Sequence, residues 1–197
     1  MTWTWPVLIV FARLVFSALA QSLFAAGYSF QGHPDPWGAA APWFPVWGSL
    51  VDVGCLLLLA WRVRREGIRL RDLLTGFERR RVGRDLLEGG GILLASLAVY
   101  GTLERQPPFG SLPLWAAFYS VFVWPILWAI TEELTYLGYA LPRLEALSGR
   151  AWLAVAIVGL GWAGQHIAQP LGDASWMLFR FASMLPIVAV LLPLMDR

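Results

Sequence analysis

Long apolar stretches separated by short polar segments dominate the sequence. The first runs from Pro6 to Gly27, 22 residues interrupted only by Arg13 and Gln21. About 20 consecutive apolar residues in a helix suffice to cross the hydrocarbon core of a bilayer. Further stretches of this kind are Val46–Trp61, Gly89–Leu103, Ser111–Thr131, Ala151–Gly172 and Ala174–Met195. The pattern therefore predicts an all-α fold, a polytopic membrane helix bundle of about six transmembrane helices.

Composition supports the same class. Hydrophobic residues make up 58% of the chain, charged residues only 14%, and there are 12 tryptophans, which excludes an ordinary soluble globular protein. We find no internal repeat and no soluble segment, so residues 1–197 are expected to form a single membrane domain. The single Cys55 excludes an internal disulfide and is interpreted as a small buried hydrophobe.

An arginine-rich segment from Arg62 to Arg84 is expected to set the topology. It holds nine of the 15 basic residues, and short loops rich in Arg or Lys stay in the cytoplasm. The stretch from Tyr28 to Pro45, a Pro- and Gly-rich loop without Arg, is then external. With six spans, both termini come out cytoplasmic, in the inner (plasma) membrane of the cell. Orientation explains the arginines more simply than nucleic-acid binding, and no nucleic acid is expected as a partner.

Two charges interrupt the first two spans. Arg13 lies about 10 Å along its helix, close enough for its side chain to reach the nearer interface. We prefer this interpretation to a role as counter-ion for a buried glutamate. Asp52 is open to two interpretations, either pairing with another helix or lying close to the interface.

The adjacent Glu132 and Glu133 carry the largest free-energy cost of membrane insertion in the sequence, because they directly follow an uncharged stretch of 21 residues, Ser111–Thr131. An ionised acid near the bilayer centre costs about 2.5 to 3.5 kcal/mol on insertion scales. At about 100° per residue the two cannot point the same way. One can face a polar interior while the other holds a neighbouring helix; alternatively, the pair is solvated at the cytoplasmic end of a span.

A second polar element, Gln165-His166, interrupts the fifth span. These residues, with the glutamates, suggest a family. The segments that carry the suggestion are Glu132-Glu133-Leu-Thr-Tyr-Leu-Gly138-Tyr-Ala-Leu-Pro142-Arg143-Leu144 and Trp162-Ala-Gly-Gln-His166. They resemble the first two motifs of the CAAX-protease and bacteriocin-processing family, also called CPBP or Abi, whose members are intramembrane endopeptidases or their relatives. The close resemblance covers Val121 to His166.

The resemblance implies that Glu132, Glu133 and His166 are catalytic. In the family mechanism the first glutamate, with histidine, activates a water that attacks a peptide carbonyl. A carboxylate in a low-dielectric cavity can serve as general base, while an imidazole shares the proton or binds the oxyanion. These three groups are expected to converge on one cavity. Catalytic zinc normally keeps three protein ligands, so we expect no metal and no cofactor.

The chain also departs from the family pattern. Leu137 stands where the motif has Arg, Trp162 stands where it has Phe, and neither His nor Asn occurs after His166. The third motif of the family is therefore missing, either because the sequence ends before the last helix or because the site is incomplete. An Arg at position 137 would share a face with Glu133, so Leu137→Arg is expected to stabilise the protein.

Three functions remain open from the sequence. The first is an intramembrane glutamate-type endopeptidase of the CAAX-processing kind, which cleaves a peptide or lipidated, for example prenylated, protein near the cytoplasmic face. The second is a non-catalytic relative, an immunity or scaffold protein. The third is a small proton-coupled transporter subunit, against which the lack of an inverted repeat speaks. In each case the lipid bilayer is a partner.

Overall fold

The computed structural model describes residues 2–74, 112–168, 171 and 174–195, and it is helical without strands over these ranges. The expected third span, Gly89–Leu103, lies outside the described residues. The main helices are α1 (Thr4–Phe30), α3 (Phe44–Arg65), α5 (Leu114–Phe122), α6 (Trp124–Glu132), α7 (Leu141–Ser148), α8 (Ala151–Gln165) and α9 (Ala174–Met195). Short elements are α2 (Pro36–Ala40), the 3₁₀ turns Ala41–Trp43, Leu70–Leu74 and His166–Ala168, and a π-helix, Glu133–Ala140.

Four of the described helical segments are long and apolar enough to cross a membrane. They are Thr4–Phe30, Pro36–Arg65, Leu114–Ser148 and Ala151–Ala168. The predicted all-α membrane bundle is thereby confirmed, and the chain is a multi-pass membrane protein. The expected sixth span is a helix with the predicted bounds, Ala174–Met195.

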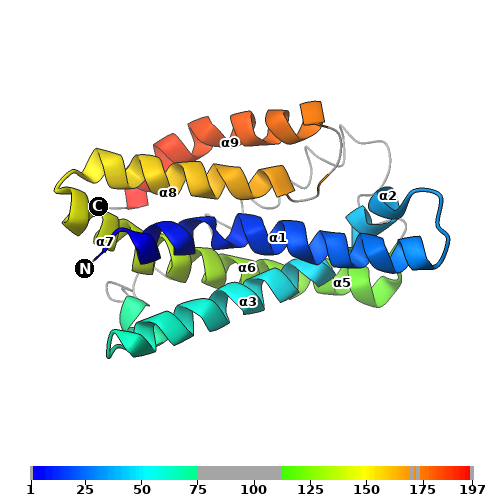
Figure 1. The fold of residues 1–197 in the computed structure, drawn as a ribbon, viewed down its shortest axis with the longest axis horizontal. Coiled ribbons are helices and arrows are strands. Elements are labelled where there is room, and N and C mark those ends of the chain that lie inside the picture. Colours follow the sequence, from blue (N-terminus) through cyan, green and yellow to red (C-terminus); the bar gives the residue numbers. More distant parts are fainter. Residues whose placement is uncertain (1, 75–111, 169–170, 172–173, 196–197) are drawn as a thin grey trace.

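Helix α1 runs through the middle of the bundle, as Figure 1 shows. It packs against α3 on one side and α8 on the other, while α9 packs on α8 and α6 on α3. The start of α1, the arginine-rich end of α3, helix α7 and the C-terminal end of α9 all lie at the same end of the bundle. This agrees with the expected position of the termini relative to the arginines, and the side of the membrane stays a prediction.

The expected external loop from Tyr28 to Pro45 is largely helical. Helix α1 continues to Phe30, and α2 starts at Pro36. The Asp35 side chain accepts a hydrogen bond from the Gly38 backbone N–H at 2.9 Å. An Asp cap followed by Pro at the first helical position starts a helix even in a Pro-rich segment, which explains the difference.

The long segment from Leu114 to Ser148 contains two irregularities. It breaks at Val123, where φ is −107°, between α5 and α6 and two residues before Pro125. The second irregularity is the π-helix that begins at Glu133. It precedes Pro142, which cannot donate a backbone hydrogen bond and crowds the carbonyl group four residues earlier. Wider π turns are rare and frequently lie at functional sites.

A tight turn joins α7 to α8 and sets the depth of the polar residues. Gly149 ends α7 with φ of 64°, a left-handed conformation that glycine adopts without steric cost. Because α7 continues to Ser148, Glu132 lies about 24 Å from the turn on one helix and Gln165 about 21 Å from it on the next. The two polar elements of the sequence lie level with each other.

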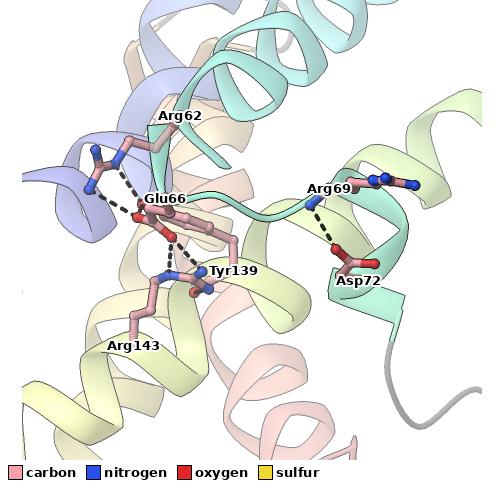
Figure 2. A network of polar contacts seen from close by, with 6 residues as sticks. All are labelled: Arg62, Glu66, Arg69, Asp72, Tyr139 and Arg143. Atoms are coloured by element: carbon pink, nitrogen blue, oxygen red, sulfur yellow. Dashed lines mark hydrogen bonds and ion pairs between the residues drawn. The ribbon is translucent and has the colours of Figure 1, made fainter. Parts of the chain in front are cut away.

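A polar network fastens the arginine-rich end of α3 to α7 (Figure 2). The Glu66 carboxylate accepts from Arg143 Nη2 at 2.6 Å and pairs with Arg62 Nη2 at 2.9 Å. The Tyr139 hydroxyl donates to Glu66 at 2.9 Å, and the guanidinium of Arg143 lies 4.0 Å from the Tyr139 ring centre. Arg143, part of the sequence stretch that resembles the protease family, therefore makes structural contacts in this protein.

Candidate active site

Glu132 is the last residue of α6, directly before the π-helix. Its side chain is 12% exposed and accepts a hydrogen bond from Gln165 Nε2 at 2.5 Å. The same carboxylate oxygen, Oε1, lies 3.5 Å from Arg13 Nη1. Glu132 thus faces the interior of the bundle and contacts α1 and α8. This is the polar, interior position that the sequence allowed for one of the two glutamates.

Arg13 is the main correction to the sequence-based interpretation. Its side chain does not extend to the interface: the residue is 1% exposed, and Nη2 lies 2.6 Å from Asp52 Oδ1 on α3. Asp52 is fully buried and also accepts a hydrogen bond from the Trp124 indole at 3.2 Å. Removing one partner of a buried ion pair leaves an uncompensated charge in the interior. Arg13 lies between Asp52 and Glu132, so it is a counter-ion for Glu132 after all.

The polar group of Arg13, Asp52 and Glu132 lies between two apolar clusters that pack against α1, one toward each end of the helix. One cluster contains Ile9 and Val10 together with residues of α3, α7, α8 and the π-helix, and the other contains Ala20 with Trp47 and Val51. Helix α8 approaches α1 closely at Gly161, where an added Cβ would lie 3.0 Å from the Val10 carbonyl oxygen. Small residues permit such approaches between membrane helices. The approach brings Gln165, one turn further on, within reach of Glu132.

Aromatic rings enclose the polar group. Trp124 and Trp128 stack with ring centres 5.0 Å apart, and the Arg13 guanidinium lies 5.8 Å from the Trp128 ring. Across the site, Tyr136 stacks on Trp162 at 5.5 Å. Trp162, which replaces the Phe of the family motif, therefore still packs as an aromatic residue beside the π-helix. These rings keep the charges away from lipid while offering favourable cation–π contact.

His166 directly follows the Gln165 that bonds to Glu132. It is the first residue of the 3₁₀ turn after α8 and is half-buried. Helix α8 thus ends earlier than the expected span to Gly172; Pro170, which cannot continue a helix, follows closely in the sequence. The Gln21 side chain on α1 holds the next described residue, Leu171, by accepting from its N–H and donating to its carbonyl oxygen. These two hydrogen bonds hold Leu171 against α1.

Glu133 does not join Glu132 in the interior. Its side chain is exposed, whereas all three predicted catalytic groups were expected to face one cavity. The reason is the rotation of about 100° between adjacent helical residues, which the sequence already contained. The direct partner of Glu132 in the structure is Gln165. Glu133 is therefore outside the group of contacts around the buried carboxylate.

Leu137 packs against the first apolar cluster, whereas the side chain of Glu133, the partner expected for an Arg at this position, is exposed. The expectation that Leu137→Arg would stabilise the protein is thus not supported, because the new charge would enter an apolar contact surface.

Several buried polar atoms near the site have no hydrogen-bond partner among the described residues. They include Arg13 Nε and Nη1, Asp52 Oδ1, Gln165 Oε1, Tyr136 Oη and His166 Nε2. Buried polar atoms are normally satisfied by protein, water or ligand. Because Arg13 and Gln165, which contact Glu132, carry three of these atoms, the arrangement favours a site that receives a polar molecule. Within the described ranges no three His, Cys, Asp or Glu side chains are grouped so as to hold a metal ion.

The sequence alone missed three members of this group: Arg13 as counter-ion, Asp52 as its partner and Gln165 as the hydrogen-bond donor. The sequence does mark each of them as a candidate for a buried polar contact, since each is a polar residue inside an apolar stretch. What the sequence lacked was the pairing between helices that are far apart along the chain.

The described residues form a helical bundle that encloses the Glu132 carboxylate together with its counter-ion, Arg13. The chain is therefore a polytopic membrane protein with a polar site inside the bundle. Residues 112–194 match the family model described as Type II CAAX prenyl endopeptidase Rce1-like. This segment contains Glu132 and His166, and the match confirms the resemblance to the CAAX-protease family seen in the sequence. Arg13 and Asp52 lie outside the matched residues. No curated protein and no solved structure matches the chain.

Proposed function

We propose that the protein is an intramembrane glutamate-type endopeptidase of the CAAX-processing kind, which cleaves a peptide or lipidated protein. The observation that carries the proposal is the enclosed Glu132 carboxylate, bonded to Gln165 directly before His166. The family match over residues 112–194 supports the same reaction class. Catalytic roles for Glu132, Glu133 and His166 are part of the proposal.

In this mechanism Glu132 accepts a proton from a water molecule, and the resulting hydroxide attacks the carbonyl carbon of the scissile peptide bond. The proton then passes to the leaving amine, so that one acid and one amine are released. His166 Nε2, which is buried and has no hydrogen-bond partner among the described residues, is suited to bind the oxyanion or share the proton. Glu133, whose side chain is exposed, is suited to contact the substrate at the entrance to the site.

The test is cleavage of a farnesylated peptide ending in Cys-aliphatic-aliphatic-X by the full chain in proteoliposomes. Glu132→Gln should abolish cleavage, because the amide keeps the shape of the side chain but cannot accept the proton. Loss of a general base typically lowers rates by about 100- to 10,000-fold. Glu145→Gln, the same exchange further along the same helical segment, is the matched control and should cleave like the wild type. Equal cleavage by Glu132→Gln and wild type would overturn the proposal.

One observation favours a second candidate, the non-catalytic relative that acts as an immunity or scaffold protein. The sequence has Leu137 in place of the motif Arg, so one part of the family pattern is altered. This candidate predicts that wild type and Glu132→Gln are equally inactive in the cleavage assay and equally folded. The endopeptidase predicts a difference between them.

A further inference from the structure

We propose that Arg13, held by Asp52, is a positioning residue that orients the Glu132 carboxylate for its role as base. This inference rests on the proposed function for the role of Glu132, and it extends the site to two helices, α1 and α3, that lie outside the family match.

The contacts form a chain across three helices. Asp52 on α3 binds Arg13 Nη2 at 2.6 Å, and Arg13 on α1 presents its other terminal nitrogen, Nη1, to Glu132 Oε1 at 3.5 Å. Asp52 is itself fixed by the indole N–H of Trp124 at 3.2 Å. Because Asp52 and Arg13 are both almost completely buried, the guanidinium has little freedom to turn away from Glu132.

A hydrogen bond and a positive charge converge on one oxygen of Glu132. Gln165 Nε2 donates to Oε1 at 2.5 Å, and Arg13 Nη1 lies 3.5 Å from the same atom. Both interactions restrain the rotation of the carboxylate. In the proposal, the other oxygen, Oε2, receives the proton from water. Positioning of this kind lowers a reaction barrier because the reacting group is already in place.

Sharing Arg13 between two acids keeps Glu132 reactive. A carboxylate that pairs closely with its own cation is a weak base, since proton uptake would break the pair. Here the short contact of Arg13 is to Asp52, and the contact to Glu132 is longer by almost 1 Å. Arg13 can therefore orient Glu132 without neutralising it fully.

A purely structural role for the Asp52–Arg13 pair makes a different prediction, and neutral variants separate the two. Arg13→Gln leaves Asp52 buried without its cation, which endangers folding. The double variant Arg13→Gln/Asp52→Asn removes both charges and retains polar side chains that can bond to each other. If the pair only ties α1 to α3, this double variant should recover both stability and cleavage.

We expect the double variant to fold but to cleave slowly. In proteoliposomes with the farnesylated peptide, its kcat should fall by about 100-fold, the size of effect that misplacement of a reacting group by about 1 Å produces. KM should stay within about threefold, because substrate binding does not use Arg13. Arg13→Lys, which keeps the charge, should recover part of kcat. Wild-type kcat in the double variant would overturn the proposal.

A second readout does not need activity. Dicyclohexylcarbodiimide, an apolar reagent, modifies protonated carboxylic acids within membranes, and mass spectrometry of the labelled chain distinguishes Glu132 from its neighbour Glu133. Glu132 should label slowly in wild type and Arg13→Lys but at least about tenfold faster in the double variant, while labelling of Glu133 serves as the internal control. Equal labelling rates at Glu132 in all three proteins would overturn the contact itself. If wild type and Glu132→Gln cleave equally, the proposed function fails, and the labelling result still decides whether Arg13 controls Glu132.

Discussion

At the scale of single residues, the contrast between Glu132 and Glu133 shows how one step along a helix decides the environment of a charge. Glu132 is enclosed and meets Gln165 and Arg13, whereas Glu133 is exposed. The same consideration applies to Leu137, whose side chain packs on an apolar cluster. Replacing it with a charged residue would place the new group where no buried partner is in contact with it.

Leu137→Arg should therefore lower the stability of the protein. We expect a loss of about 1 to 3 kcal/mol, typical of an uncompensated charge or an overfilled contact at a partly buried position. Thermal unfolding in detergent measures it, with Leu137→Met as a control that conserves volume and should stay close to wild type. A raised unfolding temperature for Leu137→Arg would show instead that the new side chain reaches an acidic partner.

At the scale of elements, the site depends on how closely α8 approaches α1. Gly161 allows this approach, and the turn at Gly149 places Glu132 and Gln165 at the same depth. Membrane helices associate through close packing and polar contacts, since lipid offers no hydrophobic driving force between them. A methyl group at the contact should therefore disturb the site more than the same methyl group elsewhere on α8.

Gly161→Ala and Gly164→Ala form a matched pair on α8 that tests this packing. A Cβ at Gly161 would overlap the Val10 side chain, whereas a Cβ at Gly164 would meet nothing within 4 Å. Gly161→Ala should cost about 1 to 3 kcal/mol of stability. Gly164→Ala should gain about 0.5 to 1 kcal/mol, because alanine favours the helix. Thermal unfolding compares the two, and similar shifts for both variants would contradict the close approach.

At the scale of the whole molecule, charge distribution predicts how the bundle sits in the bilayer. The arginine-rich end of α3 lies at the same end of the bundle as the start of α1 and the C-terminal end of α9 (Figure 1). Arg64 and Arg65 are exposed there, and the positive-inside rule assigns such an end to the cytoplasm. The turn between α1 and α2 is then on the outer side.

Cysteine labelling in intact cells tests this orientation. In a Cys55→Ala background, Ser29→Cys should react with a membrane-impermeant maleimide, and Arg64→Cys should react only after the cells are permeabilised. Both positions are exposed in the structure, so a difference between them reports the side of the membrane. Labelling of Arg64→Cys but not Ser29→Cys in intact cells would reverse the topology.

The sequence by itself determined the class of fold, the existence and approximate bounds of most described helices, and the residues that suggest the protease family. These properties are local: apolar length, charge bias and motif spacing are read along one segment at a time. Glu132 and His166 were found this way, since ionisable residues in apolar stretches are conspicuous.

Only the tertiary structure decided which polar residues meet. Arg13, Asp52 and Glu132 come from three helices, and the interpretation of each in isolation left its partner open or, for Arg13, was wrong. The free energy of a buried charge depends on its neighbours, and those neighbours are set by the packing of α1 against α3 and α8 and of α6 against α3. Hydropathy along the chain contains no information on these contacts, because it does not record which helix faces lie against one another.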